Sequence, residues 1–315
     1  MDFIGIGIQF ALLIIGFVLL IKGSDFFVDG SSNIASILKV PTLIVGLTIV
    51  AFGTSAPEAA VSITSSLAGS NALALSNVIG SNLFNMMLII GLCALLNELK
   101  ITKQVLNVDL PFLVFLTGVL TAFILFGWNI TRIEGIILLI LIISYVTYLV
   151  HNARKSEESK VVEKPKMGLL RSIIYIVGGV AGIIIGADFV VDSASYIAMA
   201  FGMSETLVGL TIVAMGTSLP ELVTSLTALR KGENELIIGN VIGSNIFNIS
   251  MVLGASSAIS PIGVNPNMLP DIALMLGVTI LFFIFGKTQS KYDKKEGFVL
   301  LALFIIYMAF AILRN

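Results

Sequence analysis

The feature that most constrains the fold is a six-residue motif that occurs twice within long apolar segments. Residues 53–58 read Gly-Thr-Ser-Ala-Pro-Glu, and residues 216–221 read Gly-Thr-Ser-Leu-Pro-Glu. The proline lacks a backbone donor and interrupts a helix, and carbonyls freed in this way are tolerated within hydrocarbon only where they line a protein cavity. A glutamate at the same depth is costly and indicates an ion or proton site. A proline kink beside a protonated glutamic acid would explain one copy, but two copies in matching positions disfavour it.

The apolar segments predict an all-α membrane protein. Hydrophobic residues make up 57% of the 315 residues and charged residues only 12%, whereas soluble domains carry about 25%. We expect the lipid bilayer as its surroundings, and neither nucleic acid nor an obligate protein partner. Runs of spanning length predict ten transmembrane helices, at residues 4–24, 41–67, 72–97, 106–127, 133–151, 169–191, 204–229, 234–260, 268–286 and 297–313.

The two halves of the chain are related by duplication. Residues 46–58 and 209–221 differ only at two positions, and residues 77–85 and 240–248 differ only at one. Five predicted helices precede a charged linker and five follow it. We therefore expect a first five-helix repeat at 1–151, a cytoplasmic linker at 152–168 and a second five-helix repeat at 169–315.

The positive charges predict the orientation in the membrane. With both termini outside, every Lys and Arg except Arg132 and Arg314 falls on the cytoplasmic side, as the positive-inside rule requires. Five spans per half then insert the second repeat upside down. Inverted repeats with interrupted helices are typical of alternating-access transporters. The motif-bearing segments are too long for plain spans, so we expect helices 2, 3, 7 and 8 to be broken.

Oxygen donors gather around each glutamate. Thr54, Ser55 and Glu58 lie within about one helical turn, and Ser81 and Asn85 project from one face of the following helix. Such hard ligands suit Ca²⁺ and Na⁺, whereas the lack of a Cys or His cluster disfavours zinc, copper and iron. The predicted ion ligands, including two backbone carbonyls at alanines, are Ala51, Thr54, Ser55, Glu58, Ser81, Asn85, Ala214, Thr217, Ser218, Glu221, Ser244 and Asn248.

The charge of this set suggests which ions it exchanges. If Glu58 and Glu221 face one cavity and stay ionised, they supply two negative charges, which neutralise one Ca²⁺. Three Na⁺ at the same site would leave one positive charge. Exchange of three Na⁺ for one Ca²⁺ would therefore be electrogenic.

The paired segments resemble the two alpha repeats of the cation/calcium antiporter superfamily, specifically its sodium/calcium exchanger branch of the prokaryotic type. The resemblance covers nearly the whole chain. It implies ten helices in two inverted repeats, with helices 2, 3, 7 and 8 forming the ion core and helices 1 and 6 sliding across it. It implies a secondary transporter of Na⁺ and Ca²⁺ in a prokaryotic cell membrane, not an enzyme, with no cofactor. By motif position it places the ion ligands on the same twelve residues.

Departures from related patterns narrow the function. Potassium-dependent members carry aspartate where this chain has Asn248, so we expect no potassium co-transport. The linker is too short for the calcium-sensing domains of animal exchangers. The proton/calcium branch reads Gly-Asn-x-x-Glu at the glutamate, where this chain reads Thr-Ser-x-Pro-Glu. A Ca²⁺/H⁺ antiporter remains the main alternative, followed by a passive cation channel and an intramembrane enzyme.

Two pairs of acids also stand in equivalent positions of the halves. Asp25 and Asp29 correspond to Asp188 and Asp192, each pair spaced by four residues. We expect hydrated helix ends here, with an ion vestibule or an interfacial latch as the alternative.

Further features have mostly structural interpretations. We expect His151 and Trp128 at membrane interfaces, where tryptophan anchors are common. Small residues in helices 1 and 6 favour close static packing over a sliding surface, as at Gly16, Gly179, Gly182 and Gly186.

Overall fold

The computed structural model describes residues 3–68, 71–153, 164–203, 208, 212 and 214–314. Eight of the helices within them are long and apolar enough to cross a membrane. A bent pair, Thr42–Thr54 with Ala56–Leu67, meets the same test together and raises the number to nine. The remaining expected span, 204–229, lies partly outside the described residues, so the structure does not test the count of ten.

The first half contains α1 (Phe3–Leu38), followed by the elements that carry the first motif and then by two long helices. In chain order these are α2 (Thr42–Val45), η1 (Gly46–Val50), α3 (Ala51–Thr54), α4 (Ala56–Leu67), α5 (Asn71–Leu83), η2 (Phe84–Ile89), α6 (Ile90–Leu96), β1 (Leu99–Lys100), η3 (Val105–Asp109), α7 (Leu110–Gly127), β2 (Asn129–Ile130) and α8 (Arg132–Ala153).

The second half has the same order of long helix, motif elements and two further helices. Its described elements are α9 (Leu169–Ala200), α11 (Ala214–Gly216), α12 (Leu219–Lys231), α13 (Asn234–Phe247), η6 (Asn248–Val252), α14 (Leu253–Ile259), β3 (Ile262–Gly263), η7 (Pro266–Met268), α15 (Leu269–Gln289), β4 (Lys291–Tyr292) and α16 (Lys294–Arg314).

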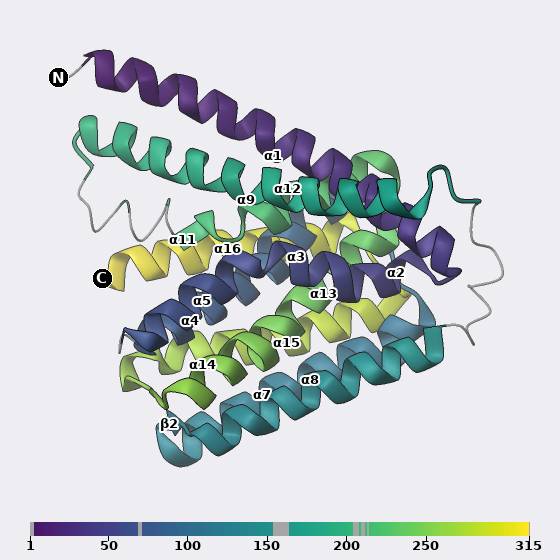
Figure 1. Cartoon of the computed structure of the whole chain (residues 1–315). Coiled ribbons are helices and arrows are strands. Elements are labelled where there is room, and N and C mark those ends of the chain that lie inside the picture. Colours follow the sequence, from purple (N-terminus) through teal and green to yellow (C-terminus); the bar gives the residue numbers. More distant parts are fainter. Residues whose placement is uncertain are drawn as a thin grey trace.

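Helices α1 and α9 lie side by side across one face of the remaining helices (Figure 1). Their facing surfaces are joined through glycine. A Cβ atom on Gly23 would lie 2.8 Å from the carbonyl oxygen of Gly179, and one on Gly179 would lie 2.7 Å from the amide nitrogen of Phe27. Gly16 and Gly186 meet in the same way. These glycines therefore hold two backbones in direct contact, the static packing that the sequence favoured.

Both helices are longer than predicted. The apolar runs indicated spans at 4–24 and 169–191, whereas α1 continues to Leu38 and α9 to Ala200. In α1 the charges beyond residue 24 have partners: Asp25 pairs with Arg230, and Asp29 pairs with Lys231 at 2.5 Å. Both acids therefore lie within α1 and not at its end, contrary to the prediction, and each is paired with a residue of α12, although Asp29 is still 47% exposed.

Their counterparts on α9 differ. Asp188 and Asp192 are exposed, and neither forms an ion pair with any residue that the structure describes. The ion-paired contact between α1 and α12 is therefore not repeated between α9 and the described part of the first motif helix.

The first motif breaks its helix at Ser55. There the backbone leaves helical geometry, with φ −82° and ψ 7°, and the two pieces meet at 48°. Pro57 follows within the first turn of α4, where a missing backbone donor has no consequence. The second motif turns in the same way at Ser218, with φ −91° and ψ 4°, before Pro220 in α12. The prediction of a break at helix 2 is confirmed.

Helices 3 and 8 are not broken, contrary to the prediction. Leu73–Leu96 and Asn234–Ile259 each run as one helix. Neither contains a proline; instead, each passes through a π-helical segment, η2 or η6. A π-helical turn accommodates an extra residue without ending the helix, and such turns often occur at functional sites.

Two short antiparallel ladders join the halves. Leu99 pairs with Tyr292 in β1 and β4, and Ile130 pairs with Ile262 in β2 and β3. In Figure 1 the start of α1 and the end of α16 lie at one side of the molecule, and the residues that flank 154–163 lie at the other.

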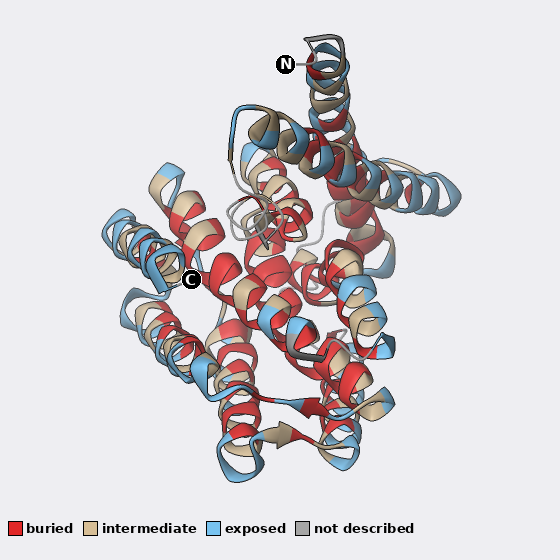
Figure 2. Cartoon of the chain, turned by 90° about the vertical axis from the view of Figure 1, so that its left-hand side faces the viewer, coloured by how far each residue is buried: buried red, intermediate tan, exposed pale blue. Residues whose placement is uncertain are grey.

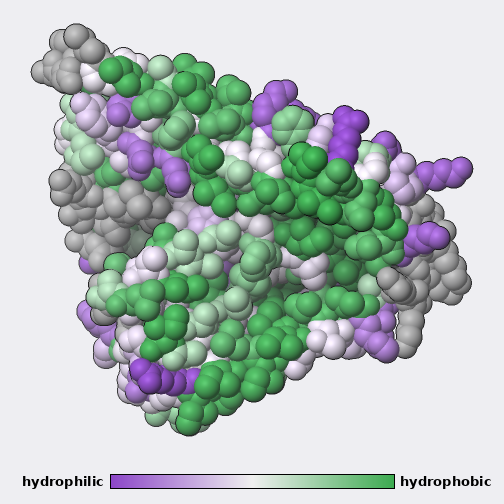
Figure 3. All heavy atoms as spheres, in the orientation of Figure 1, coloured by the Kyte–Doolittle hydropathy of each residue, from purple (hydrophilic) through white to green (hydrophobic). Residues whose placement is uncertain are grey.

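The core is central and the periphery is apolar. Figure 2 shows buried residues concentrated in the central helices, where 89% of the most apolar window of Asn234–Ile259 is buried, against 17% for Gly5–Leu38. The face in Figure 3 is covered largely by hydrophobic residues between the helix ends. Exposed apolar residues over most of a surface are expected where lipid replaces water. The chain is therefore a multi-pass integral membrane protein.

Candidate ion-binding site

The two motif glutamates are buried inside the protein, and each accepts hydrogen bonds from residues of both halves of the chain. Glu58 lies in the first turn of α4 and is fully buried. Its Oε1 accepts hydrogen bonds from Ser81 of α5 and from Ser218, which precedes α12, at 3.3 Å each. The hydroxyl oxygens of Ser218 and Ser81 lie 3.1 Å apart. The first glutamate is therefore held by one serine from each half.

Glu221 has the equivalent environment. It lies in the first turn of α12 and is fully buried. Its Oε1 accepts from Ser55 at 3.0 Å and from Ser244 of α13 at 3.5 Å. Since Ser55 corresponds to Ser218 and Ser244 to Ser81, the halves exchange one serine each. The structure thus brings these six predicted residues into one cluster.

Thr54 joins the same cluster through a residue that the sequence analysis did not select. Its hydroxyl lies 3.4 Å from the hydroxyl of Ser244 and donates to Asn240 Oδ1 at 3.0 Å. Asn240 in turn donates to Ser225 at 3.0 Å and to the backbone carbonyl of Glu221 at 3.4 Å. Asn240 therefore ties the motif threonine of one half to the motif glutamate of the other.

Asn77 does the same in the opposite direction. Its Oδ1 accepts from Thr217 at 3.4 Å, and its Nδ2 donates to Ser62 at 3.1 Å and to the backbone carbonyl of Glu58 at 3.4 Å. Asn77 and Asn240 were not predicted as site residues, although both begin the second duplicated segment. An asparagine repeated beside a repeated serine was the signal that could have identified them.

Two predicted amide ligands lie on segments that pack against the glutamate-bearing helices, since η2 contacts α12 and η6 contacts α4. Asn85 lies in η2 and donates to Asn245 Oδ1 at 3.1 Å, and Asn248 begins η6 and donates to Asn82 Oδ1 at 3.3 Å. All four side chains are at most 1% exposed. The π-helical segments therefore begin where the predicted amide ligands are presented.

The structure gives less support to the two predicted backbone ligands, the carbonyls of Ala51 and Ala214. The carbonyl of Ala51 accepts a hydrogen bond from the amide of Ser55 at 3.0 Å. The break at Ser55 therefore leaves this oxygen hydrogen-bonded rather than free. Ala214 begins α11. Its predicted contribution is also a backbone oxygen.

Four buried oxygens of the cluster accept no hydrogen bond from the residues that the structure describes. They are Glu58 Oε2, Glu221 Oε2, Asn85 Oδ1 and Asn248 Oδ1. Buried polar atoms are normally partnered, and an unpartnered carboxylate is costly. Two carboxylate and two amide oxygens with nearby hydroxyls match the ligands that Ca²⁺ and Na⁺ take. We call these four oxygens, with the surrounding hydroxyls of Thr54, Ser55, Ser81, Thr217, Ser218 and Ser244, the oxygen cage.

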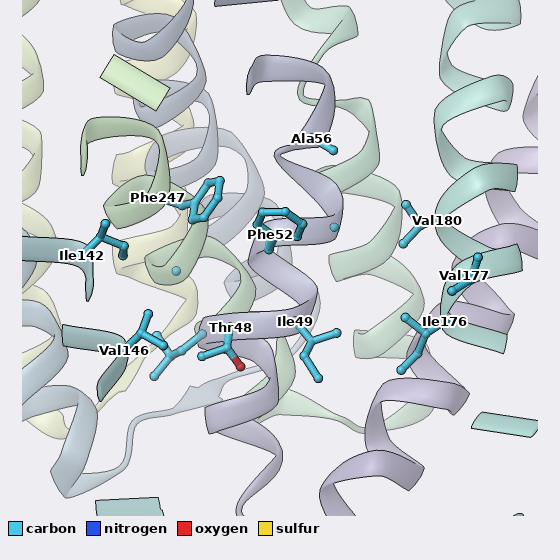
Figure 4. A pocket seen from close by; sticks show the side chains of 13 residues that line it. Thr48, Ile49, Phe52, Ala56, Ile142, Val146, Ile176, Val177, Val180 and Phe247 are labelled. Carbon is cyan, nitrogen blue, oxygen red and sulfur yellow. The ribbon is translucent and has the colours of Figure 1, made fainter. Parts of the chain in front are cut away.

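An apolar cavity of about 520 Å³ lies beside the first motif helix. Figure 4 shows side chains of α8, such as Ile142, on one side of this cavity and side chains of α9, such as Val177, on the other. Phe52 and Phe247 lie between them in an edge-to-face contact, with ring centroids 5.1 Å apart. Among the described residues that line it, the one polar side chain is Thr48, which donates to the carbonyl of Ile44 at 2.6 Å. The cavity is therefore suited to hydrocarbon and not to ions.

Comparisons with known proteins agree on one family. The family model described as "Sodium/calcium exchanger protein" matches residues 8–151 and 171–313. Inner membrane protein YrbG of Escherichia coli is 37% identical over 311 residues, which cover 95% of each chain. Sodium/calcium exchanger MaX1 of Methanosarcina acetivorans is 32% identical, with 96% of this chain and 98% of that protein covered.

A solved structure extends the likeness to the fold. The sodium–calcium exchanger NCX_Mj, soaked with Na⁺ and Sr²⁺, superposes with a TM-score of 0.85 at 33% identity. The alignment covers 96% of this chain and 99% of that chain. The chain therefore has the fold of NCX_Mj.

Proposed function

The chain belongs to the sodium/calcium exchanger protein family, and we propose that it exchanges Na⁺ for Ca²⁺ across the membrane as a secondary antiporter. Members named among its relatives are exchangers and antiporters, not enzymes. The transported ions are substrates, and no cofactor takes part in the proposal. The predicted cell membrane of a prokaryote is part of the same proposal.

One observation carries the proposal: two fully buried glutamates, each with one unpartnered oxygen, share a cage with two unpartnered amide oxygens. Buried carboxylates favour a cation when each is held by hydroxyl donors rather than by a Lys or Arg. Among the described residues, the ion pairs all lie outside the cage. The cage therefore supports ten of the twelve predicted residues as ion ligands, those that would bind through their side chains, with the glutamates supplying the charge; the two alanine carbonyls rest on their motif positions alone.

The charge of the cage supports an electrogenic, potassium-independent cycle. Glu58 and Glu221 bring two negative charges, and Asn248 is neutral. One Ca²⁺ is then balanced, whereas three Na⁺ carry one net positive charge. A third carboxylate at position 248 would be needed to balance an additional cation. We therefore propose a cycle that moves net charge and does not require K⁺.

Alternating access is proposed to arise from movement of α1 and α9 against the motif helices. The glycine contacts make these two helices one packing unit, and their outward faces are exposed. The duplicated elements, the exchanged serines and the two ladders support inverted repeats divided at the linker 152–168, with five helices on either side. The start of α1 and the end of α16 lie on one side of the molecule and the residues that flank 154–163 on the other, which supports an orientation that, by the positive-inside rule, has both termini outside.

The test is ion flux with purified protein in liposomes. A Na⁺ gradient directed out of the liposomes is expected to drive Ca²⁺ accumulation, and the reversed gradient is expected to drive Ca²⁺ release, with rates that respond to membrane voltage and not to K⁺. A pH gradient without Na⁺ is the decisive comparison. Ca²⁺ uptake driven by protons alone would replace this proposal with a Ca²⁺/H⁺ antiporter, and uptake that needs no counter-ion would indicate a channel.

A further inference from the structure

The orientation of the terminal group matters for the asparagine ligands of the cage and not for the glutamates. A carboxylate shows oxygen on either side, whereas an asparagine shows oxygen on one side and an NH₂ group on the other. Asn248 binds a cation only if its oxygen faces the cage; the opposite rotamer would direct NH₂ hydrogens at the ion. Some neighbouring group must therefore decide which atom of Asn248 faces inward.

Asn82 occupies the position needed for that decision. It is 1% exposed and lies near the end of α5, three residues before Asn85. Its Nδ2 donates to the backbone carbonyl of Asn245 at 3.4 Å. A backbone carbonyl can only accept, so this contact requires the NH₂ side of Asn82 to face Asn245.

The orientation of Asn82 then fixes that of Asn248. With its NH₂ group directed at the carbonyl of Asn245, Asn82 offers Oδ1 to its other neighbour. Asn248 Nδ2 donates to this oxygen at 3.3 Å, and none of the residues that the structure describes donates to Asn248 Oδ1. Reversing Asn248 would set two amide oxygens against each other. The direction is thus passed from a backbone carbonyl through Asn82 to Asn248.

The opposite half lacks the anchoring contact. Asn245 Oδ1 accepts from Asn85 at 3.1 Å, but Asn245 Nδ2 has no partner among the described residues. Asn245 is therefore not directed by a carbonyl, although it has the same sequence position and burial as Asn82. The duplication is symmetric in sequence and asymmetric in this hydrogen-bond relay.

We propose that Asn82 is a positioning residue that turns the amide oxygen of Asn248 into the oxygen cage. This rests on the proposed function, because it assumes that Asn248 is an ion ligand. Asn82 itself does not touch the ion; it acts through Asn248. Residues that orient a ligand in this way typically contribute ten- to a hundredfold to metal affinity.

The test is a double-variant comparison in liposomes. Asn82→Leu keeps the shape of the side chain and removes both hydrogen-bonding atoms. We expect it to raise the Ca²⁺ concentration for half-maximal Na⁺-driven exchange by about tenfold or more. In an Asn248→Asp background, the side chain presents an oxygen to the cage in either rotamer. The same Asn82→Leu change is therefore expected to have little effect on the Ca²⁺ dependence of exchange.

The outcomes separate this proposal from a packing effect and from the function itself. If Asn82→Leu weakens Ca²⁺ dependence equally in both backgrounds, or in neither, the positioning role is refuted. Should the leucine variant fail to fold, Asn82→Ser gives the same prediction, because a serine hydroxyl cannot reach both Asn245 and Asn248. If the unaltered protein shows no Na⁺-driven Ca²⁺ flux, the proposed function fails before any variant is compared.

Discussion

Neutralising one cage glutamate is expected to abolish exchange without unfolding the protein. In Glu58→Gln the remaining amide oxygen still accepts from Ser81 and Ser218, as Oε1 does now at 3.3 Å. The new NH₂ group replaces Oε2, the atom that accepts no hydrogen bond from any described residue. The change therefore removes charge and one ligand oxygen while keeping the hydrogen bonds that hold the side chain.

The size of the effect follows from the burial of the site. Two unit charges about 4 Å apart interact by roughly 4 kcal/mol at an effective dielectric constant near 20. A divalent ion doubles this term, and relief of carboxylate desolvation in the free site offsets part of it. A net loss of about 4 kcal/mol would weaken Ca²⁺ binding by roughly a thousandfold, since each 1.4 kcal/mol is a factor of ten.

The assay is Na⁺-gradient-driven uptake of radioactive calcium into liposomes containing equal amounts of folded protein. Glu221→Gln should behave like Glu58→Gln, because Glu221 has the equivalent contacts with Ser55 and Ser244. Glu98→Gln is the matched control: this glutamate is half exposed and pairs with Lys291 at the surface. Uptake by either cage variant within tenfold of the control would refute the assignment of the glutamates as charge-bearing ligands.

Three further predictions address the cage, the packing and the helix ends. Asn248→Asp is expected to keep the fold and change the voltage dependence or ion preference of exchange, because the cage would then carry three carboxylates; unchanged currents would remove Asn248 from the ligand set. Gly179→Ala is expected to destabilise the α1–α9 contact by about 1–3 kcal/mol and to lower the melting midpoint, because its Cβ would lie 2.7 Å from Phe27 N. Gly178→Ala is the control, since a Cβ there meets nothing within 4 Å. Equal melting midpoints for the two variants would contradict the packing. Asp293→Ala is expected to lower the melting midpoint at neutral pH, because the carboxylate accepts the amides of Lys295 and Glu296 at the start of α16. The amides of Glu296 and Lys295 lower the pKa of Asp293 below its usual 3.8. The stabilisation is therefore complete above pH 3.8 and is lost as the pH falls through the lowered pKa. Below the lowered pKa the variant and the parent should melt alike, and a difference that persists in acid would show another cause.

The sequence determined the class of the molecule and the chemistry of its site. Apolar runs that contain Pro57 and Pro220, with a glutamate after each, are local features, so they predict a membrane protein with two buried acids. The duplication then predicts that the same ligand types occur twice. The hydroxyls and amides that form the cage, including Ser81 and Asn85, were identified from these patterns alone.

Other features followed from tertiary contacts. The charges that appeared to end the first span lie inside α1 because Arg230 and Lys231 reach them from α12. Helices 3 and 8 stay continuous because π-helical segments absorb the irregularity without a proline. In the ion pairs, Asp25 and Asp29 are far in sequence from Arg230 and Lys231, so a local pattern cannot predict them.

The composition of the cage is likewise a tertiary result. Ser218 reaches Glu58 across 160 positions, and Ser55 reaches Glu221 across 166. Hydrogen-bond direction depends on which donor faces which acceptor, so a repeated asparagine such as Asn82 or Asn245 reads the same in both halves. Only the folded arrangement gives Asn82 a backbone carbonyl to donate to, whereas the described part of the chain offers Asn245 none. The sequence by itself therefore determined which atoms are available to an ion, and the tertiary structure decided which way they point.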